Sequence, residues 1–179
     1  MKFVLAATCA AMLGLGAPAP ALAQSAQGLD ETLSFIRDQI AQQGQVNLVA
    51  SNRDPATGQS WVNQTSQEGS NFSVDVANCQ INLHWRTVYN GKVDFDGDGG
   101  IPFRLVDHVT VLSLDDYFAG VNAAGGHSAW TTQASPPLTV VSAVRANGVE
   151  NIFYFQDSEL ANRVAQAMRH AVELCGATR

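Results

Sequence analysis

The chain has 179 residues, of which 46% are hydrophobic and 15% charged, and its formal net charge at pH 7 is −6. This length and apolar content suit one globular domain with a hydrophobic core of its own. The acidic balance argues against nucleic acid and anionic lipid surfaces as partners, because both require a basic protein surface.

The first 23 residues have the pattern of an export signal. Lys2 supplies a positive start, a short apolar run follows, and the Ala-Leu-Ala at positions 21–23 is typical of a cleavage site before Gln24. The apolar run is too short to span a bilayer, and no second long apolar segment follows it. We therefore expect residues 1–23 to be removed and residues 24–179 to form a single periplasmic or secreted domain. Ten Lys and Arg less Lys2 leave nine basic residues against 16 acidic ones.

Two cysteines, Cys79 and Cys175, remain once the signal has been removed with Cys9. The residues before Cys9 lack the pattern of a lipid-anchor site. In an oxidising compartment the remaining pair most simply forms one disulfide, and the alternative is two free buried thiols. A bridge closing so long a loop stabilises the fold by roughly 4 to 5 kcal/mol in the chain-entropy estimate. The sequence thus predicts a covalent link between the middle of the chain and its end.

The first element of the predicted domain is a helix. Apolar residues recur at spacings of three and four in residues 29–40, which places them on one stripe of a helix over about 30–43. Asp30 is suited to cap this helix at its start, and Gly44 is suited to end it.

Strand patterns follow the helix. Apolar and polar residues alternate in residues 46–50 and again in residues 72–76, which is typical of half-buried antiparallel strands. Trp61 indicates a short strand in the polar segment between them. The clearest alternation covers residues 79–86, so Cys79 is expected to point inward with the apolar residues of that strand.

An acidic motif comes after the next turn. Asn-Gly at positions 90–91 is preferred in two-residue hairpin turns because both positions need positive φ, and residues 92–95 are expected to return as the partner strand. Carboxylates then stand at alternate positions, Asp94, Asp96 and Asp98, with glycine after the second and the third.

These three aspartates resemble the first half of an EF-hand calcium loop. Oxygens two residues apart in such a loop bind one hard cation while glycine makes the turn. Ile101 has the apolar character of the eighth loop position, but Leu105 stands at the twelfth, where the EF-hand has its bidentate glutamate. Two interpretations stay open, a weak Ca²⁺ site at Asp94, Asp96 and Asp98 and a solvated acidic turn.

The middle of the chain is less regular. Residues 101–114 are apolar enough for one bent strand or two short ones. The aspartate pair at 115–116 is expected to cap or begin a short helical turn, and residues 121–133 to form mainly a loop. His127 and Trp130 in this loop are candidate binding residues, because loops held by a rigid sheet often carry recognition side chains.

The last part of the chain predicts a hairpin and a long helix. Residues 138–145 and 149–155 flank a second Asn-Gly pair at 147–148, which favours a turn between two strands. Asp157 is suited to cap the helix that follows, and its apolar stripe runs through to Cys175. The second cysteine is therefore expected on the buried face.

Together these elements predict an α+β fold, with about seven strands in a bent antiparallel sheet or partial barrel between an N-terminal helix and a long C-terminal helix. A final strand pair that leads into a long capped helix resembles the end of pleckstrin-homology-like domains, in which that helix closes one end of the bent sheet. The Ala-rich helix over residues 161–175, which ends in a cysteine, is also similar to exported bacterial proteins of unknown function. Neither resemblance implies particular binding residues.

The sequence contains few signs of a catalytic site. The sequence has no Gly-x-Ser-x-Gly motif, and its four histidines lack the spacing of a zinc site. His84 and His170 are expected on polar, solvent-facing sides of their elements. A hydrolase would require His127, Ser128 and the aspartates at 115–116 to assemble only in the folded chain.

The leading hypothesis is an exported, non-enzymatic binding module that recognises an envelope protein or peptide, with an inhibitor or immunity protein as one form of it. It follows from the export signal, the predicted disulfide across the core and the lack of catalytic groups that converge on one point. The alternatives are a small secreted hydrolase that uses the His127/Ser128 loop and a Ca²⁺-stabilised accessory domain. No other cofactor, no nucleic acid and no membrane span are expected.

Overall fold

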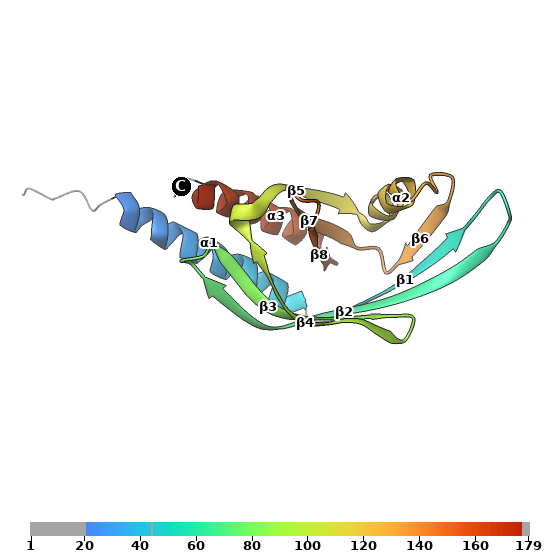
Figure 1. Cartoon of the computed structure of the whole chain (residues 1–179), viewed down its shortest axis with the longest axis horizontal. Helices are drawn as coiled ribbons and strands as arrows, with labels where there is room; N and C mark the ends of the chain where they lie inside the picture. Colours follow the sequence, from blue (N-terminus) through green and yellow to red (C-terminus); the bar gives the residue numbers. More distant parts are fainter. Residues whose placement is uncertain (1–20, 44, 177–179) are drawn as a thin grey trace, which may run out of the picture.

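A computed structural model describes residues 21–43 and 45–176 (Figure 1). The fold is α+β, as predicted, and the described residues form three α-helices and eight strands in two antiparallel sheets. The helices are α1 (Ala21–Gln43), α2 (Leu114–Ala124) and α3 (Ser158–Gly176), and a short 3-10 helix, η1, covers Phe103–Leu105. The strands are β1 (Gln45–Arg53), β2 (Ser60–Asp75), β3 (Gln80–Tyr89), β4 (Lys92–Pro102), β5 (Val106–Ser113), β6 (Thr131–Ser135), β7 (Thr139–Arg145) and β8 (Glu150–Phe155).

The two sheets divide the strands unequally. The larger sheet has the order β4-β3-β2-β1-β6 and the smaller one the order β5-β7-β8. Figure 1 shows the larger sheet as a long curved layer, whose β1–β2 hairpin extends away from the end where α1 and α3 lie together. The strands predicted for a bent sheet or partial barrel are thus divided between two antiparallel sheets, and the 3-10 helix η1 lies between β4 of the first and β5 of the second.

The main core lies between α1, α3, the inner face of β3 and the three-stranded sheet. Both predicted helical stripes are buried in it, since Leu33 and Ile36 of α1 and Val164 and Met168 of α3 have no exposed surface. Full burial of one such side chain contributes roughly 1.5 to 3 kcal/mol. The other large side chains that are completely buried include Phe103, Phe155, Ile81, Ile101, Val140 and Val141.

The predicted disulfide between Cys79 and Cys175 is confirmed. Cys79 lies in the turn before β3 and Cys175 in the last turn of α3, with their Cα atoms 5.9 Å apart. Both residues are buried. The bridge therefore joins the five-stranded sheet to the C-terminal helix across the core.

Both predicted hairpins are present. Asn90 and Gly91 have φ angles of 49° and 77°, as a two-residue turn of type I′ requires. The second hairpin has a longer turn, in which the Gly148 N–H donates to the Arg145 carbonyl and only Gly148, at φ 80°, is left-handed. Asp157 caps α3 as predicted, because its Oδ1 accepts from the backbone N–H of Glu159 at 2.8 Å.

The N-terminal helix begins earlier than the sequence predicted. α1 starts at Ala21, so Asp30 lies inside the helix and does not cap it. Alanine and glutamine before Gly28 are good helix formers, and they continue the helix although the apolar stripe begins only at Leu29. The proposed signal falls mostly outside the described residues, as does Gly44, and its cleavage stays a prediction.

The polar segment around Trp61 forms part of one long strand. β2 runs without a break from Ser60 to Asp75, where two separate strands were expected. Pairing with β1 on one side and β3 on the other holds its Asn, Gln and Ser residues in extended conformation. A bulge between Ser70 and Ser73, with Asn71 at φ 53°, bends the strand.

The region after β5 is also more regular than expected. Instead of one short turn, α2 continues to Ala124, and Ser113 caps its start, since the Ser113 side chain accepts a hydrogen bond from the Asp116 N–H. Part of the expected loop is strand β6, which pairs with β1 at the edge of the larger sheet. Capping and pairing thus order most of a segment whose composition favoured a loop.

Candidate functional site

The candidate site is the outer edge of the five-stranded sheet, formed by β4. This strand is the last in the sheet and pairs with β3 alone, from Tyr89–Lys92 next to the turn to Gln80–Pro102 at the far end. No other element of the described chain packs along it beyond isolated contacts. The site is therefore a strand of eleven residues with one open side.

The acidic motif lies within this strand and not in a turn. Asp96 pairs with Arg86, Gly97 with Trp85 and Asp98 with His84. Aspartate and glycine are unfavourable in strands, but the type I′ turn fixes the register and β3 supplies a strongly alternating partner. The prediction of a turn over these residues was wrong because pairing overrides their local preference.

The open side of β4 carries backbone groups that β3 does not use. The Gly100 carbonyl accepts a hydrogen bond from Nη2 of Arg145 at 3.0 Å, so it faces away from β3. Backbone groups alternate in direction along an antiparallel strand, which directs the N–H and C=O groups of Asp96 and Asp98 outward as well. Such a row of groups is a template for another strand.

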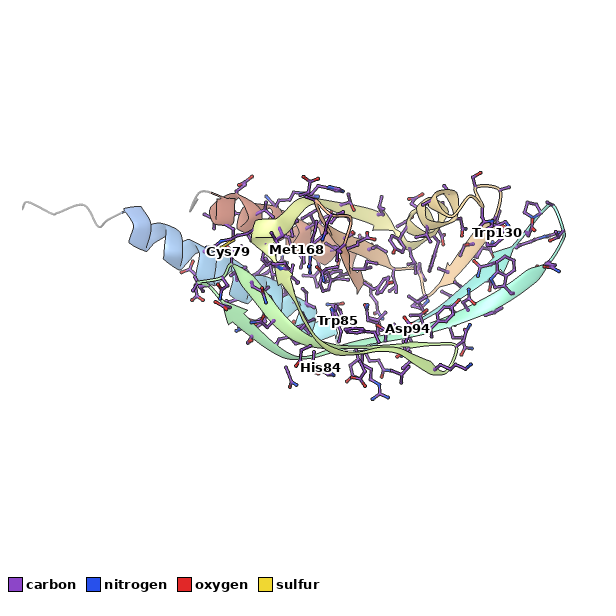
Figure 2. The ribbon with its side chains drawn as sticks, in the orientation of Figure 1. Cys79, His84, Trp85, Asp94, Trp130 and Met168 are labelled. Carbon is purple, nitrogen blue, oxygen red and sulfur yellow. A yellow bond between two sulfur atoms is a disulfide. The ribbon has the colours of Figure 1, made fainter. Side chains whose placement is uncertain are left out.

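His84 binds two of the three aspartates. Its Nδ1 and Nε2 atoms each lie 2.8 Å from a carboxylate oxygen, Oδ1 of Asp98 and Oδ1 of Asp96 respectively. The carboxylate of Asp98 and then that of Asp96 raise the pKa of the imidazole above its usual 6.5. His84 lies on the outer face of the sheet, as predicted, whereas Trp85 points inward (Figure 2). The sequence pattern did not predict the two carboxylate partners of His84, because they are brought to it by the pairing of β4 with β3.

The inner face of the same edge is apolar. The Trp85 ring stacks on Phe153 with their centroids 5.6 Å apart. Gly97 pairs with Trp85 and Gly99 with Leu83, so neither position of β4 carries a side chain, and a Cβ at Gly99 would lie 3.8 Å from the indole of Trp85. The Phe95 ring lies over Gly97 and is 48% exposed. The edge thus has one acidic face and one apolar face.

The strand conformation is unlike a calcium loop. Side chains two residues apart in a strand are separated by roughly 6.6 Å, so Asp94, Asp96 and Asp98 form a row instead of surrounding one cation. Asp94 also lies at a bulge between the Thr87–Phe95 and Val88–Val93 pairs. In the part of the chain that the structure describes, no group of three or more His, Cys, Asp or Glu side chains is arranged to hold a metal ion. Ca²⁺ binding stays a prediction.

The predicted binding residues His127 and Trp130 lie at the far end of the sheet. The imidazole of His127 stacks on the Trp130 indole at 3.7 Å between centroids, and Trp61 meets the same indole edge-on at 4.7 Å. Trp61 comes from β2, almost 70 positions earlier in the chain, and no local pattern could have placed it here. The three rings pack on one another, and a binding role for His127 and Trp130 stays a prediction.

The two aspartates of the hydrolase hypothesis form structural hydrogen bonds and do not contact His127. Asp116 accepts a hydrogen bond from the Ser113 hydroxyl at the start of α2, and Asp115 accepts one from the backbone N–H of Ala134. His127 follows the other end of this helix, and an α-helix of eleven residues is roughly 16 Å long. The aspartates and the imidazole are thus held at opposite ends of one rigid element.

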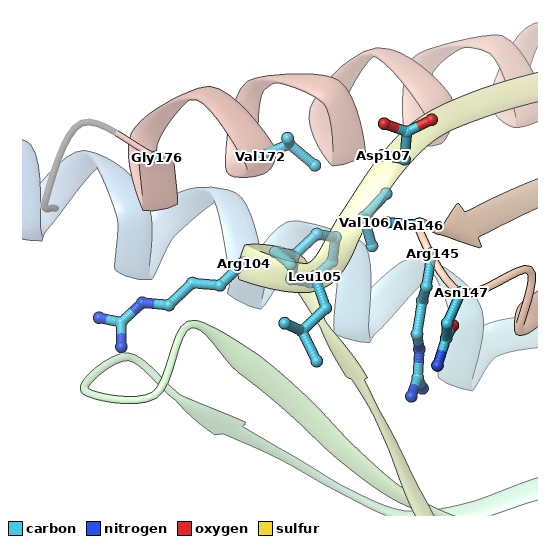
Figure 3. A pocket seen from close by; sticks show the side chains of 10 residues that line it. Arg104, Leu105, Val106, Asp107, Arg145, Ala146, Asn147, Val172 and Gly176 are labelled. Atoms are coloured by element: carbon cyan, nitrogen blue, oxygen red, sulfur yellow. The ribbon is translucent and has the colours of Figure 1, made fainter.

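A surface groove of about 530 Å³ lies between η1, the β7–β8 turn and the end of α3. Arg104 and Arg145 both line it, but Figure 3 shows their guanidinium groups on opposite sides of Leu105. Arg145 is engaged with Gly100 and with Oδ1 of Asn151, at 3.1 Å. The two guanidinium groups therefore do not converge on one ligand atom.

Known proteins do not identify the chain, since no family model, no curated protein and no solved structure matches it. The resemblance to pleckstrin-homology-like domains stays a prediction. Among the described helices, none combines the length and the apolar character needed to cross a membrane. The confirmed disulfide is compatible with an exported protein.

Proposed function

We propose that this protein is an exported, non-enzymatic binding module, periplasmic or secreted, which recognises an extended segment of an envelope protein or peptide by adding it to β4 as a new strand. The observation that carries the proposal is the open edge of β4, with outward backbone groups at alternate residues. The signal-like N-terminus and the Cys79–Cys175 bridge support the location.

The edge is long enough for this purpose and has features that limit unselective pairing. Natural proteins protect open edges with charged side chains and bulges, and β4 has both, in its aspartates and in the bulge at Asp94. In strand addition the main chain provides affinity and the flanking side chains provide selectivity. An inhibitor or immunity protein that captures one segment of its target is a specific form of this function.

Three heptapeptides, in which valine alternates with lysine, serine or glutamate, test the proposal. We expect at least one of them, at up to about 1 mM, to slow hydrogen exchange of the outward amides of β4. Asp98→Pro should abolish this protection, because proline removes an outward N–H and is tolerated on the open side of an edge strand. Asp98→Asn removes the same charge, keeps the N–H and should still bind the serine peptide.

Two results would overturn strand addition at β4. One is that none of the three peptides protects the β4 amides. The other is that Asp98→Pro binds the peptides as tightly as the wild type while its unfolding temperature shows an intact fold. Protection confined to residues near His127 and Trp130 would instead favour the aromatic end of the sheet as the binding surface.

A further inference from the structure

We infer that the segment bound at β4 is basic on one face and apolar on the other, with lysine or arginine at alternate positions. The inference rests on the proposed strand addition and names the class of segment that the edge selects. It follows from the two different faces of β4, the acidic one at Asp96 and Asp98 and the apolar one at Gly97 and Gly99.

The acidic face selects positive charge. A strand added beside β4 would place its side chains roughly 4.5 to 5.5 Å from those of Asp96 and Asp98 on the same face. Opposite charges at this separation stabilise a strand pair, and like charges destabilise it. The Asp98 side chain is 92% exposed, so it is accessible to an incoming lysine or arginine.

The neighbouring cationic side chains neutralise the carboxylates of Asp96 and Asp98 only in part. His84 and Arg86 belong to β3, and so they approach the aspartates from the paired side of β4, opposite its open side. His84 contacts one oxygen of each carboxylate, while Nε of Arg86 lies 4.0 Å from the second oxygen of Asp96. Asp98 is therefore the less neutralised of the two and should contribute most to charge selection.

The other face selects large apolar side chains. Gly99 leaves a gap in the side-chain layer beside Trp85, and the half-exposed Phe95 ring, which lies over Gly97, borders this gap. An apolar residue on the added strand would fill the gap at Gly99 and contact the two rings, as bulky neighbours do next to glycine in other sheets. Basic and apolar residues must then alternate in the segment, because successive side chains point to opposite faces.

A second copy of this chain fits the edge poorly. Two β4 strands paired with each other would bring the carboxylates of one copy close to those of the other on the same face, which is unfavourable. The same repulsion applies to acidic partners in general. A partner with alternating positive charge is consequently the occupant that the edge favours.

The three heptapeptides of the previous experiment also test this inference through their relative affinities. We expect the lysine peptide to bind roughly five-fold more tightly than the serine peptide and the glutamate peptide to bind weakest. The preference should nearly vanish in about 0.5 M salt, which screens exposed charges. The double variant Asp96→Asn/Asp98→Asn should bind the lysine and serine peptides equally.

A matched control separates local charge from net charge. Asp30→Asn/Glu159→Gln removes two exposed acidic groups from α1 and α3, far from β4 in the sequence and on other elements, and should keep the preference for lysine. Equal binding of all three peptides with protection of β4, or tightest binding of the glutamate peptide, would overturn the basic pattern and leave strand addition intact. Absence of protection by any peptide would overturn both.

Discussion

At the scale of single residues, His84 links the acidic edge to pH. Its imidazole contacts Asp96 and Asp98 at 2.8 Å each, and the two carboxylates favour its protonated form. The pKa of His84 is therefore raised in the folded protein relative to the ordinary value of 6.5 that the unfolded chain should have. The contact stabilises the fold only while the imidazole is charged.

We predict that the stabilisation from His84 is fully present below about pH 6.5 and is lost as the pH rises through the raised pKa of the folded state. The measurement is the free energy of unfolding in urea for the wild type and His84→Gln, at about pH 5.5 and about pH 9. The difference between the two proteins should be larger at the lower pH. A difference that is constant, or that grows with pH, would show that the imidazole is not held by these carboxylates.

At the scale of elements, the turns determine which strands form. The Asn90-Gly91 turn sets the register that makes a strand of an Asp- and Gly-rich segment, and Gly148 closes the second hairpin at φ 80°. Glycine is needed at Gly148 because other residues are strained in the left-handed region. By contrast, Gly120 lies inside α2, and a Cβ there would meet nothing within 4 Å.

These two glycines give a matched pair of substitutions with opposite signs. Gly148→Ala should lower the free energy of unfolding by roughly 1 to 2 kcal/mol, because alanine is strained at positive φ. Gly120→Ala should raise it by roughly 0.4 to 1 kcal/mol, because alanine restricts the unfolded chain and favours the helix. Urea unfolding of both variants is the measurement. A neutral Gly148→Ala would contradict the turn geometry, and a destabilising Gly120→Ala would contradict the open surroundings of that position.

At the scale of the whole molecule, the disulfide is the one covalent link between distant parts of the described chain. Cys79 and Cys175 are 96 positions apart, and their bridge joins the five-stranded sheet to α3. A loop of this length loses much of its conformational freedom in the unfolded state when it is closed. The bridge should therefore stabilise the domain mainly by its effect on the unfolded chain.

We predict that Cys79→Ala/Cys175→Ala destabilises the protein by roughly 4 kcal/mol relative to the oxidised wild type. Urea unfolding measured with and without a reductant provides the comparison. The reductant should shift the wild type toward the variant and leave the variant unchanged. A loss below about 1 kcal/mol would mean that the bridge contributes little beyond the packing of its neighbours.

Short-range patterns in the sequence were sufficient to predict many features of this fold. Helical stripes, Asn-Gly turns, the Asp157 cap and the pairing of the only two cysteines in the described chain could all be predicted, because spacing and local conformational preference decide them. The same patterns placed His84 correctly on the polar face of its strand. They also gave the α+β class.

Features that depend on residues far apart in the chain could be seen only in the folded protein. Aspartates 94–98 became an edge strand because β3 pairs with them, and Trp61 reached Trp130 because β1 joins β2 to β6. The division into two sheets followed from the break at η1. Strand formation depends on which other strand is available to accept the backbone hydrogen bonds, and no short window of sequence contains that partner.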